Sequence, residues 1–295
     1  MTSYQMALRR HLGEYKAQRL GIREAGVYRK TGRAYQHLLP STLRYLNLLE
    51  SIRGEFRDYL RHNPTVRLHP DFHHLNSSQA LAFNLFYPYL SAGGEAARLL
   101  AQVLGLGGDI RKWRFEYVPD AEEGTNVDVA WQNSGGTWAF CEVKLSESEF
   151  GGTKPDQRHE KKFHEIYSPR LHGLVDERLL EFNEFCRHYQ LLRNISLLAT
   201  HADSHVVFLI PEQNNALSPA LHAVLGSLAA SVRHRVHVAY LEKVLVSIKN
   251  HSTLNPELKL YAAQLQEKYV VKSNTKTPPN MAIQGRALAA RLLRG

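Results

Sequence analysis

Two charged residues stand at the end of an otherwise apolar stretch, residues 137–145 (TWAFCEVKL). Side chains alternate between the two faces of a β-strand, so Glu142 and Lys144 project to the same side of the strand that this stretch predicts. Both faces begin with apolar residues, which is typical of a central strand covered on both sides. A charge buried there without a partner costs several kcal/mol, so the fold must bring other polar groups to these two residues.

A third charge occupies a similar position in the preceding apolar stretch. Asp128 lies between Val127 and Val129 in residues 126–131 (NVDVAW), and the turn-forming sequence QNSGG separates this stretch from residues 137–145. Two strands connected in this way are expected to form a hairpin. The hairpin would bring all three charges to one place.

Two acids and one amine in one place suit the hydrolysis of a phosphodiester. Two carboxylates, here Asp128 and Glu142, hold a hard cation such as Mg²⁺, which keeps water ligands for the reaction. The cation lowers the pKa of a bound water, and an ammonium such as that of Lys144 stabilises the attacking water or the phosphate. The backbone carbonyl of Val143, between the two charged residues, is a further candidate metal ligand.

Apolar periodicity and capping residues predict the elements around this hairpin. In chain order they are helical residues 1–62 with the clearest helix over 41–62, helices from Ser77 and from Gly94 to a C-cap at Gly105, strands 113–118, 126–131 and 137–145, helices 156–167 and 176–198, strand 205–210, a helix over 221–232, and a strand running into a helix over 236–246. The expected order is therefore helix, three strands, helices and strand.

The D…EVK arrangement within this order resembles the PD-(D/E)XK nuclease superfamily, and the wording is similar to a bacterial restriction-endonuclease-like branch. The matching phrases are YQHLLP, LNSSQALAFNLFYP, NVDVAW, FCEVKLSESEFG and YQLLRN. The resemblance implies an α/β fold: a restriction-endonuclease-like core (α-β-β-β-α-β) with a central mixed sheet flanked by helices, and an N-terminal helical extension. We accordingly expect an N-terminal helical region (1–70), the nuclease-like core (71–250) and a C-terminal helical and basic tail (251–295).

Carried over residue by residue, the resemblance implies that Asp128 and Glu142 bind the metal and that Lys144 lies beside the scissile phosphate. Val127 stands where the motif has its proline. Gln190, in YQLLRN, occupies a helix on which related nucleases often present a glutamine to the active site, and it is a fourth candidate catalytic residue.

Four further residues are weaker candidates. Many relatives place an acidic ligand on the first core helix, where this chain has Gln79, and Glu116 on the first strand is the residue that would compensate. Arg187 and Asn194 extend a polar stripe on the helix of Gln190 and are candidate nucleic-acid contacts. The alternative for Gln79 is a helix-capping role, and the alternative for Glu116 is a solvated strand residue. The alternative for the polar stripe is the solvent-exposed face of an amphipathic helix.

The net charge of +9 favours a polyanionic partner, because phosphate contacts supply most non-specific nucleic-acid affinity. We expect a Mg²⁺-dependent endonuclease that hydrolyses DNA, with Mn²⁺ as a substitute metal, RNA as the alternative polymer, and a homodimer if both strands are cut. The competing hypothesis is an inactive nucleic-acid-binding protein on the same fold. No apolar run is long enough to span a membrane and only two cysteines are present, so a cytoplasmic location is expected.

Two segments complete the sequence. Residues 69–74 (HPDFHH) are rich in histidine, but they lack cysteine and lie in an irregular segment, so that the i, i+4 spacing of His69 and His73 does not make a helical metal site; this favours surface histidines over a transition-metal site. Residues 272–295 carry five basic residues and no acid, and they are expected to form a basic tail with a short terminal helix.

Overall fold

The computed structural model describes residues 1–201 and 203–272. The helices are α1 (Ser3–Arg19), α2 (Glu50–His62), α3 (Ser78–Ala92), α4 (Gly94–Val103), α5 (Gln157–Lys162), α6 (Ser168–Leu171), α7 (Phe182–Arg187), α8 (Tyr189–Thr200), α9 (Ser218–Gly226), α10 (Ala230–Arg233), α11 (Leu241–Asn250) and α12 (Pro256–Tyr269). The strands are β1 (Gly26–Val27), β2 (Ala34–Tyr35), β3 (Ile110–Tyr117), β4 (Val127–Asn133), β5 (Trp138–Val143), β6 (His205–Ile210) and β7 (Val236–Tyr240). The expected basic tail lies, apart from Lys272, outside the described residues.

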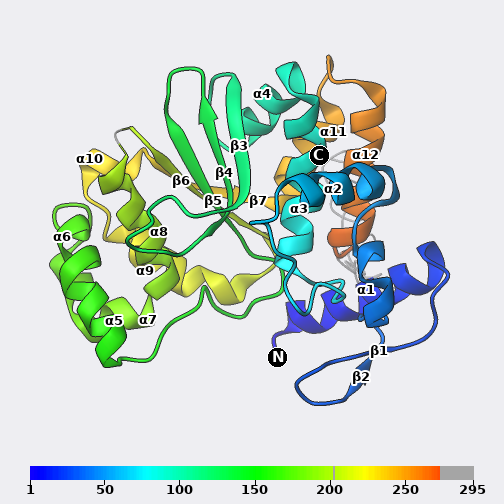
Figure 1. The fold of residues 1–295 in the computed structure, drawn as a ribbon, viewed down its shortest axis with the longest axis horizontal. Helices are drawn as coiled ribbons and strands as arrows, with labels where there is room; N and C mark the ends of the chain where they lie inside the picture. The colour runs from blue at the N-terminus through cyan, green and yellow to red at the C-terminus, as the bar shows by residue number, and fades with distance from the viewer. Residues whose placement is uncertain (202, 273–295) are drawn as a thin grey trace, which may run out of the picture.

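A five-stranded mixed sheet forms the centre of the molecule, in the order β3-β4-β5-β6-β7 (Figure 1). β3, β4 and β5 are antiparallel neighbours, and β5, β6 and β7 are parallel. Helices α3, α4, α11 and α12 lie on one side of the sheet with α1 and α2, and α5 to α9 lie on the other side. This arrangement confirms the expected α/β class and its central mixed sheet flanked by helices.

The two sides of the sheet bury separate apolar cores. On β6, Val207 and Leu209 pack in the core formed with α3, α11 and α12. Val206, Phe208 and Ile210 alternate with them and pack in the core formed with α7, α8 and α9. Apolar residues on both faces make β6 a fully covered strand. β5, which pairs with it in parallel, is held between the same two layers.

The N-terminal extension is less helical than expected, because residues 20–40 turn back on themselves. Within them β1 and β2 pair as a short antiparallel ribbon, with Gly26 opposite Tyr35. A Cβ at Gly26 would collide with the backbone of Leu39, so the close approach of the two segments requires glycine. Gly32, in the left-handed region at φ 68°, closes the turn between the strands.

The helix expected over residues 41–62 is interrupted, which corrects the prediction. A 3₁₀ helix (Ser41–Asn47) ends at Leu48 and Leu49, whose backbones are extended, before α2 begins. The cause is Asn84 of α3, which is fully buried: its Oδ1 accepts from the Leu49 N–H at 2.8 Å and its Nδ2 donates to the Asn47 carbonyl at 2.9 Å. A side chain from a distant helix thus replaces the helical hydrogen bonds at this point.

The helix expected over residues 221–232 also divides, into α9 and α10. The interruption occurs where residues 174–176 run alongside: the Asp176 N–H donates to the Ser227 carbonyl, and the Ala229 N–H donates to the Leu174 carbonyl, both at 2.9 Å. Val175 and Leu228 form the bridge between these two segments. Within the part of the chain that is described, no helix has both the length and the apolar character needed to cross a bilayer.

The buried hydrogen bonds of Asn84 give a first prediction. Asn84→Leu removes the partners of Leu49 and Asn47 and also breaks a 2.7 Å bond to the Tyr269 hydroxyl, with little change in side-chain volume. Leaving buried polar groups unpaired is expected to lower the free energy of unfolding by about 3 kcal/mol. Urea unfolding measures the loss, with Asn183→Leu at an exposed position as the control. Equal stability of the two variants would contradict this account of the interrupted helix.

Candidate active site

Asp128 meets β5 at the point where the pairing of β4 and β5 ends. The two strands pair as far as Val129 opposite Cys141. Beyond that pair, the backbone N–H of Val143 donates to Asp128 Oδ2 at 2.7 Å. The N–H and the carbonyl of one strand residue point to the same side, so the Val143 carbonyl also faces β4. The side chain of Asp128 is therefore fixed beside the backbone that carries the other two charges.

Glu142 and Lys144 are both buried, at 6% and 7% exposure, and they form an ion pair. Lys144 Nζ donates to Glu142 Oε1 at 2.8 Å and to Gln190 Oε1, at the start of α8, at 2.6 Å. Gln190 therefore holds the lysine amine in place from the helical layer that contains α8. The structure brings Asp128, Glu142, Lys144 and Gln190 together, as the sequence analysis expected them to lie.

The second oxygen of Glu142 is held by two residues of α8. Asn194 Nδ2 donates to Glu142 Oε2 at 3.1 Å, and Arg193 approaches the same oxygen at 3.4 Å. Asn194 is only 2% exposed, so it orients this carboxylate from inside the protein instead of standing on the surface. Arg193 was missed by the sequence analysis. Its signal was available, because it follows Gln190 by three positions and so lies on the same helical face.

The helix expected over residues 176–198 is divided at Glu181, whose backbone is extended, and again at His188. The Gln190 N–H donates to the Gly151 carbonyl at 3.1 Å, and the Thr153 N–H donates to the Cys186 carbonyl at 2.8 Å. The loop after β5 thus bonds to the backbone between α7 and α8 and separates the two helices. Arg187, on the far side of the break, is exposed and pairs with Glu184 at 2.8 Å.

The charges act differently on the two carboxyl groups. Burial raises the pKa of Asp128 well above its ordinary value, and the charge of Glu142 raises it further, while Lys144 opposes them. Burial also acts to raise the pKa of Glu142, but Lys144 and Arg193 outweigh it and hold that pKa below its ordinary value. Burial disfavours the charged form of Lys144, but Glu142 prevails and its pKa is raised. Asp128 is therefore the carboxyl that lacks a sufficient counter-charge.

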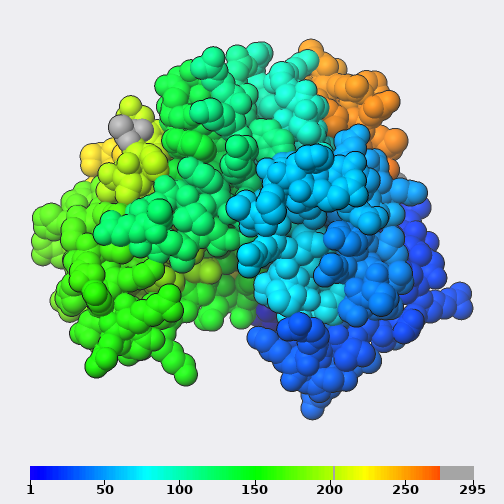
Figure 2. All heavy atoms as spheres, viewed as in Figure 1, coloured from blue at the N-terminus to red at the C-terminus, as the bar shows by residue number. Residues whose placement is uncertain are grey.

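Asp128 lines a cleft of about 530 Å³, which Gln79, Glu116 and Asn126 also line. Figure 2 shows the surface hollowed between the segment drawn in green and the N-terminal segments drawn in blue. Gln79 Nε2 donates to Glu116 Oε1 at 2.7 Å, and Asn126 bonds to the other oxygen. Gln79 and Glu116, the two additional candidate site residues, therefore contact each other at the wall of this cleft.

Glu116 has a backbone conformation that the sequence did not reveal. Its φ of 48° lies in the left-handed region, which costs a non-glycine residue about 1 kcal/mol or more. Burial raises the pKa of Glu116. Among the described residues, neither Asp128 nor Glu142 belongs to a group of three acidic, histidine or cysteine side chains that lie close enough together to hold a metal ion.

The loop that leaves β5 adds Ser146 and Glu147 to the cleft, and the sequence analysis gave neither a role. Glu147 Oε2 accepts from the Leu145 N–H at 2.7 Å. The carbonyl of Ser146 accepts from Nε2 of Gln5, in α1, at 2.7 Å. The N-terminal helix is thus fastened directly to the loop beside the three charges.

Adjacent antiparallel strands that bring two carboxylates and a lysine together beside a cleft define a restriction-endonuclease-like protein of the PD-(D/E)XK type. The family model described as Restriction Endonuclease associating with ARP matches residues 9–270, and the chain belongs to that family. The resemblance seen in the motifs is confirmed, and the chain is a nuclease-like protein. No curated protein and no solved structure gives a significant match to it.

The contrast between two arginines of neighbouring helices gives a second prediction. Arg193 contacts the buried Glu142, with 10% of its side chain exposed, whereas 68% of the Arg187 side chain is exposed. Removing one partner from a buried ion pair costs about 3 kcal/mol, so Arg193→Met is expected to lower the free energy of unfolding by that amount. Arg187→Met should cause no resolvable change in urea unfolding. A stable Arg193→Met variant would show that the buried cluster does not need this charge.

The opposite pKa shifts of Asp128 and Glu142 give a third prediction: substitutions that neutralise the two carboxyl groups change the melting temperature in opposite directions when EDTA keeps metal away. A raised pKa means that ionised Asp128 destabilises the folded chain at neutral pH, so Asp128→Asn is expected to raise the melting temperature by roughly 2–4 °C. The gain should shrink as the pH falls and the wild-type carboxyl takes up its proton. Glu142→Gln should lower the melting temperature, because the lowered pKa means that ionised Glu142 stabilises the fold. That loss should also shrink in acid. Thermal melts of both variants over a pH series measure these effects. A lowered melting temperature for both variants at neutral pH would contradict the opposite pKa shifts of the two carboxyl groups.

Proposed function

We propose that the protein is a Mg²⁺-dependent endonuclease that hydrolyses phosphodiester bonds of DNA. The observation that carries the proposal is the convergence of Asp128, Glu142 and Lys144 through the contacts of Val143 N–H with Asp128 and of Lys144 with Glu142 and Gln190. Two carboxylates and an ammonium beside an open cleft are the groups that metal-assisted phosphodiester hydrolysis requires. The family membership supports the same activity.

The residues fit a divalent cation on the Asp128 side of the site. The carboxyl of Asp128 is short of counter-charge and lines the cleft, so a cation held there would satisfy it. We assign its ligands to Asp128, Glu142 and the Val143 carbonyl, with oxygen atoms throughout, as Mg²⁺ prefers and Mn²⁺ accepts. When bound, the cation supplies an acidified water and charge neutralisation at the phosphate.

The protein's own residues would position the reaction. Lys144, kept protonated by its acidic neighbours, stabilises the attacking water or a phosphate oxygen, and Gln190 fixes the direction of its amine. To hold the cation, Glu142 would have to release one oxygen from its present partners, and Arg193 and Asn194 would limit that movement. Glu116 and Gln79, at the cleft wall, would act on waters of the cation and not as direct ligands.

DNA is the proposed substrate because the net charge is +9 and the site opens to a cleft at the surface. RNA is the alternative polymer. Exposed Arg187 is available to a phosphate, whereas buried Asn194 would act through Glu142. Cleavage of both strands by one site at a time favours a homodimer, which we include in the proposal.

A second candidate function is a nucleic-acid-binding protein that has lost catalysis. One observation favours it: both oxygens of Glu142 are engaged by Lys144, Arg193 and Asn194. If these contacts persist when DNA and metal are present, Glu142 has no oxygen to offer the cation. Salt-sensitive DNA binding without metal-dependent cleavage would select this function.

Cleavage of supercoiled circular DNA tests the proposal. The wild-type protein is expected to nick or linearise the circle with Mg²⁺ or Mn²⁺ and to be inactive in EDTA. Lys144→Met removes the ammonium but keeps an unbranched side chain, and it is expected to lower the rate by roughly 100- to 1,000-fold.

The matched control is Lys161→Met, at a side chain that is 73% exposed on α5, which should cleave like the wild type. Circular dichroism verifies that both variants are folded. Linear DNA, single-stranded DNA and RNA run in parallel separate endonuclease from exonuclease action and identify the polymer. Undiminished cleavage by folded Lys144→Met would contradict the mechanism. Loss of activity in both lysine variants would show that the effect is not specific to Lys144 and would also count against the mechanism.

A further inference from the structure

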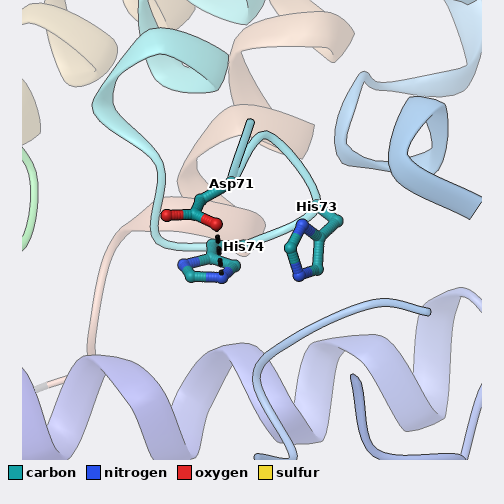
Figure 3. Close-up of side chains that lie close together, drawn as sticks. All are labelled: Asp71, His73 and His74. Carbon is teal, nitrogen blue, oxygen red and sulfur yellow. Dashed lines mark ion pairs between the residues drawn. The ribbon is translucent and has the colours of Figure 1, made fainter. Parts of the chain in front are cut away.

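Three side chains of the types that ligate metals lie together in the turn that precedes α3. Asp71, His73 and His74 each offer one ligand atom, and these atoms lie within 4.8 Å of one another (Figure 3). The expectation that these histidines stand on the surface is wrong for His73, which is 1% exposed. Asp71 and His74 line the same cleft as Asp128, but among the described residues no hydrogen bond or ion pair joins the three side chains to Asp128, Glu142 or Lys144.

The backbone of the turn is held rigidly in the core. Asn47, fully buried, donates through Nδ2 to the carbonyls of Phe72 and His74, at 2.8 and 2.7 Å. The His73 carbonyl accepts from the Leu39 N–H at 3.0 Å. The Phe72 side chain is fully buried and anchors the middle of the turn. Ligands on such a backbone need little reorganisation to bind an ion.

Two of the three side chains have buried atoms with no hydrogen-bond partner. Asp71 Oδ1 and His74 Nε2 face each other at 3.8 Å, which is too long for a hydrogen bond, and neither atom makes another hydrogen bond within the described residues. Buried polar atoms are nearly always satisfied, so two such atoms facing each other require an explanation. An ion between them would satisfy both.

The third side chain has the hydrogen bond of a metal ligand. His73 Nε2 contacts the Val27 carbonyl at 3.1 Å, and a carbonyl only accepts, so Nε2 carries the proton. Nδ1 is left with a lone pair. Metal-bound histidines typically donate their other N–H to a carbonyl in this way, which fixes the tautomer and the ring orientation.

We propose that Asp71, His73 and His74 bind one divalent transition-metal ion, of which Zn²⁺ is the best fit. Two imidazoles and one carboxylate are a typical three-residue zinc set, with a fourth position left for water. Mg²⁺ prefers oxygen ligands and is disfavoured here. The ion would tie the turn before α3 to β1 through His73 and Val27, and it would lie at the cleft wall, because Asp71 and His74 line that cleft too.

Arg29 is the one charge on the described residues that approaches the Asp71 carboxylate as an ion-pair partner besides His74. Its Nε lies 3.9 Å from Asp71 Oδ1, and 65% of its side chain is exposed. So long a contact leaves the guanidinium free to move into solvent when an ion binds. Arg29 would therefore weaken binding without preventing it, and Arg29→Ala is expected to tighten it.

The experiment uses the full chain carrying Asp128→Asn, which weakens the proposed Mg²⁺ site, after removal of metal with a chelator. Co²⁺ is titrated as a visible-absorption probe, and Zn²⁺ then competes for it. One equivalent of Co²⁺ is expected to give ligand-field bands that Zn²⁺ abolishes. Asp71→Asn and His74→Gln should each weaken binding by roughly tenfold or more. His62→Gln, at an exposed histidine, is the matched control and should bind as before.

Circular dichroism of both ligand variants separates loss of ligands from loss of folding, and a folded His74→Gln variant suffices for the test if Asp71→Asn does not fold. Unchanged binding by a folded ligand variant would overturn the proposal. Absence of Co²⁺ binding to the folded parent would do the same, and so would several weak equivalents that His62→Gln reduces equally. The result does not depend on nuclease activity.

Discussion

The buried carboxylate of Glu142 is the constraint on which this structure depends. It lies at the end of the central strand at 6% exposure, and an isolated charge there would be unstable. Lys144, two positions further along and just past the end of β5, supplies one counter-charge, and Arg193 must come from another layer to supply the second. The packing of α8 against the sheet is therefore an electrostatic requirement as well as an apolar contact. The same arrangement leaves Asp128 as the underneutralised acid, which is the property a cation site needs.

Much of this could be predicted from the sequence, because it depends on local patterns. The alternation in residues 137–145 placed Glu142 and Lys144 on one face, and the hairpin brought Asp128 to them. Strands β3 to β7 fall close to their expected positions for the same reason. The contact of Gln190 with Lys144 followed from the family resemblance, since helical spacing alone left it evenly open.

The rest depends on contacts between segments far apart in the sequence. Nothing near Leu48 signals that Asn84 will interrupt the helix expected over residues 41–62. Nothing near His188 signals that the Gly151 carbonyl will divide the next one. The continuous helix that was expected put Arg187 on the same face as Gln190, whereas the break at His188 places Arg187 in α7 and leaves Gln190 and Arg193 together on α8. The buried state of His73 likewise depends on Val27 in the N-terminal ribbon, which composition cannot show.

The break at His188 has one more effect. It gives the sheet-covering layer a new helix start at Tyr189, next to the amine of Lys144 through Gln190. The aligned peptide dipoles of a helix put about half a positive charge at its beginning. A continuous helix over residues 176–198 would have carried that potential to its distant first turn. By stopping and restarting, the chain directs this positive potential toward the amine of Lys144, beside which the proposed substrate would present its phosphate.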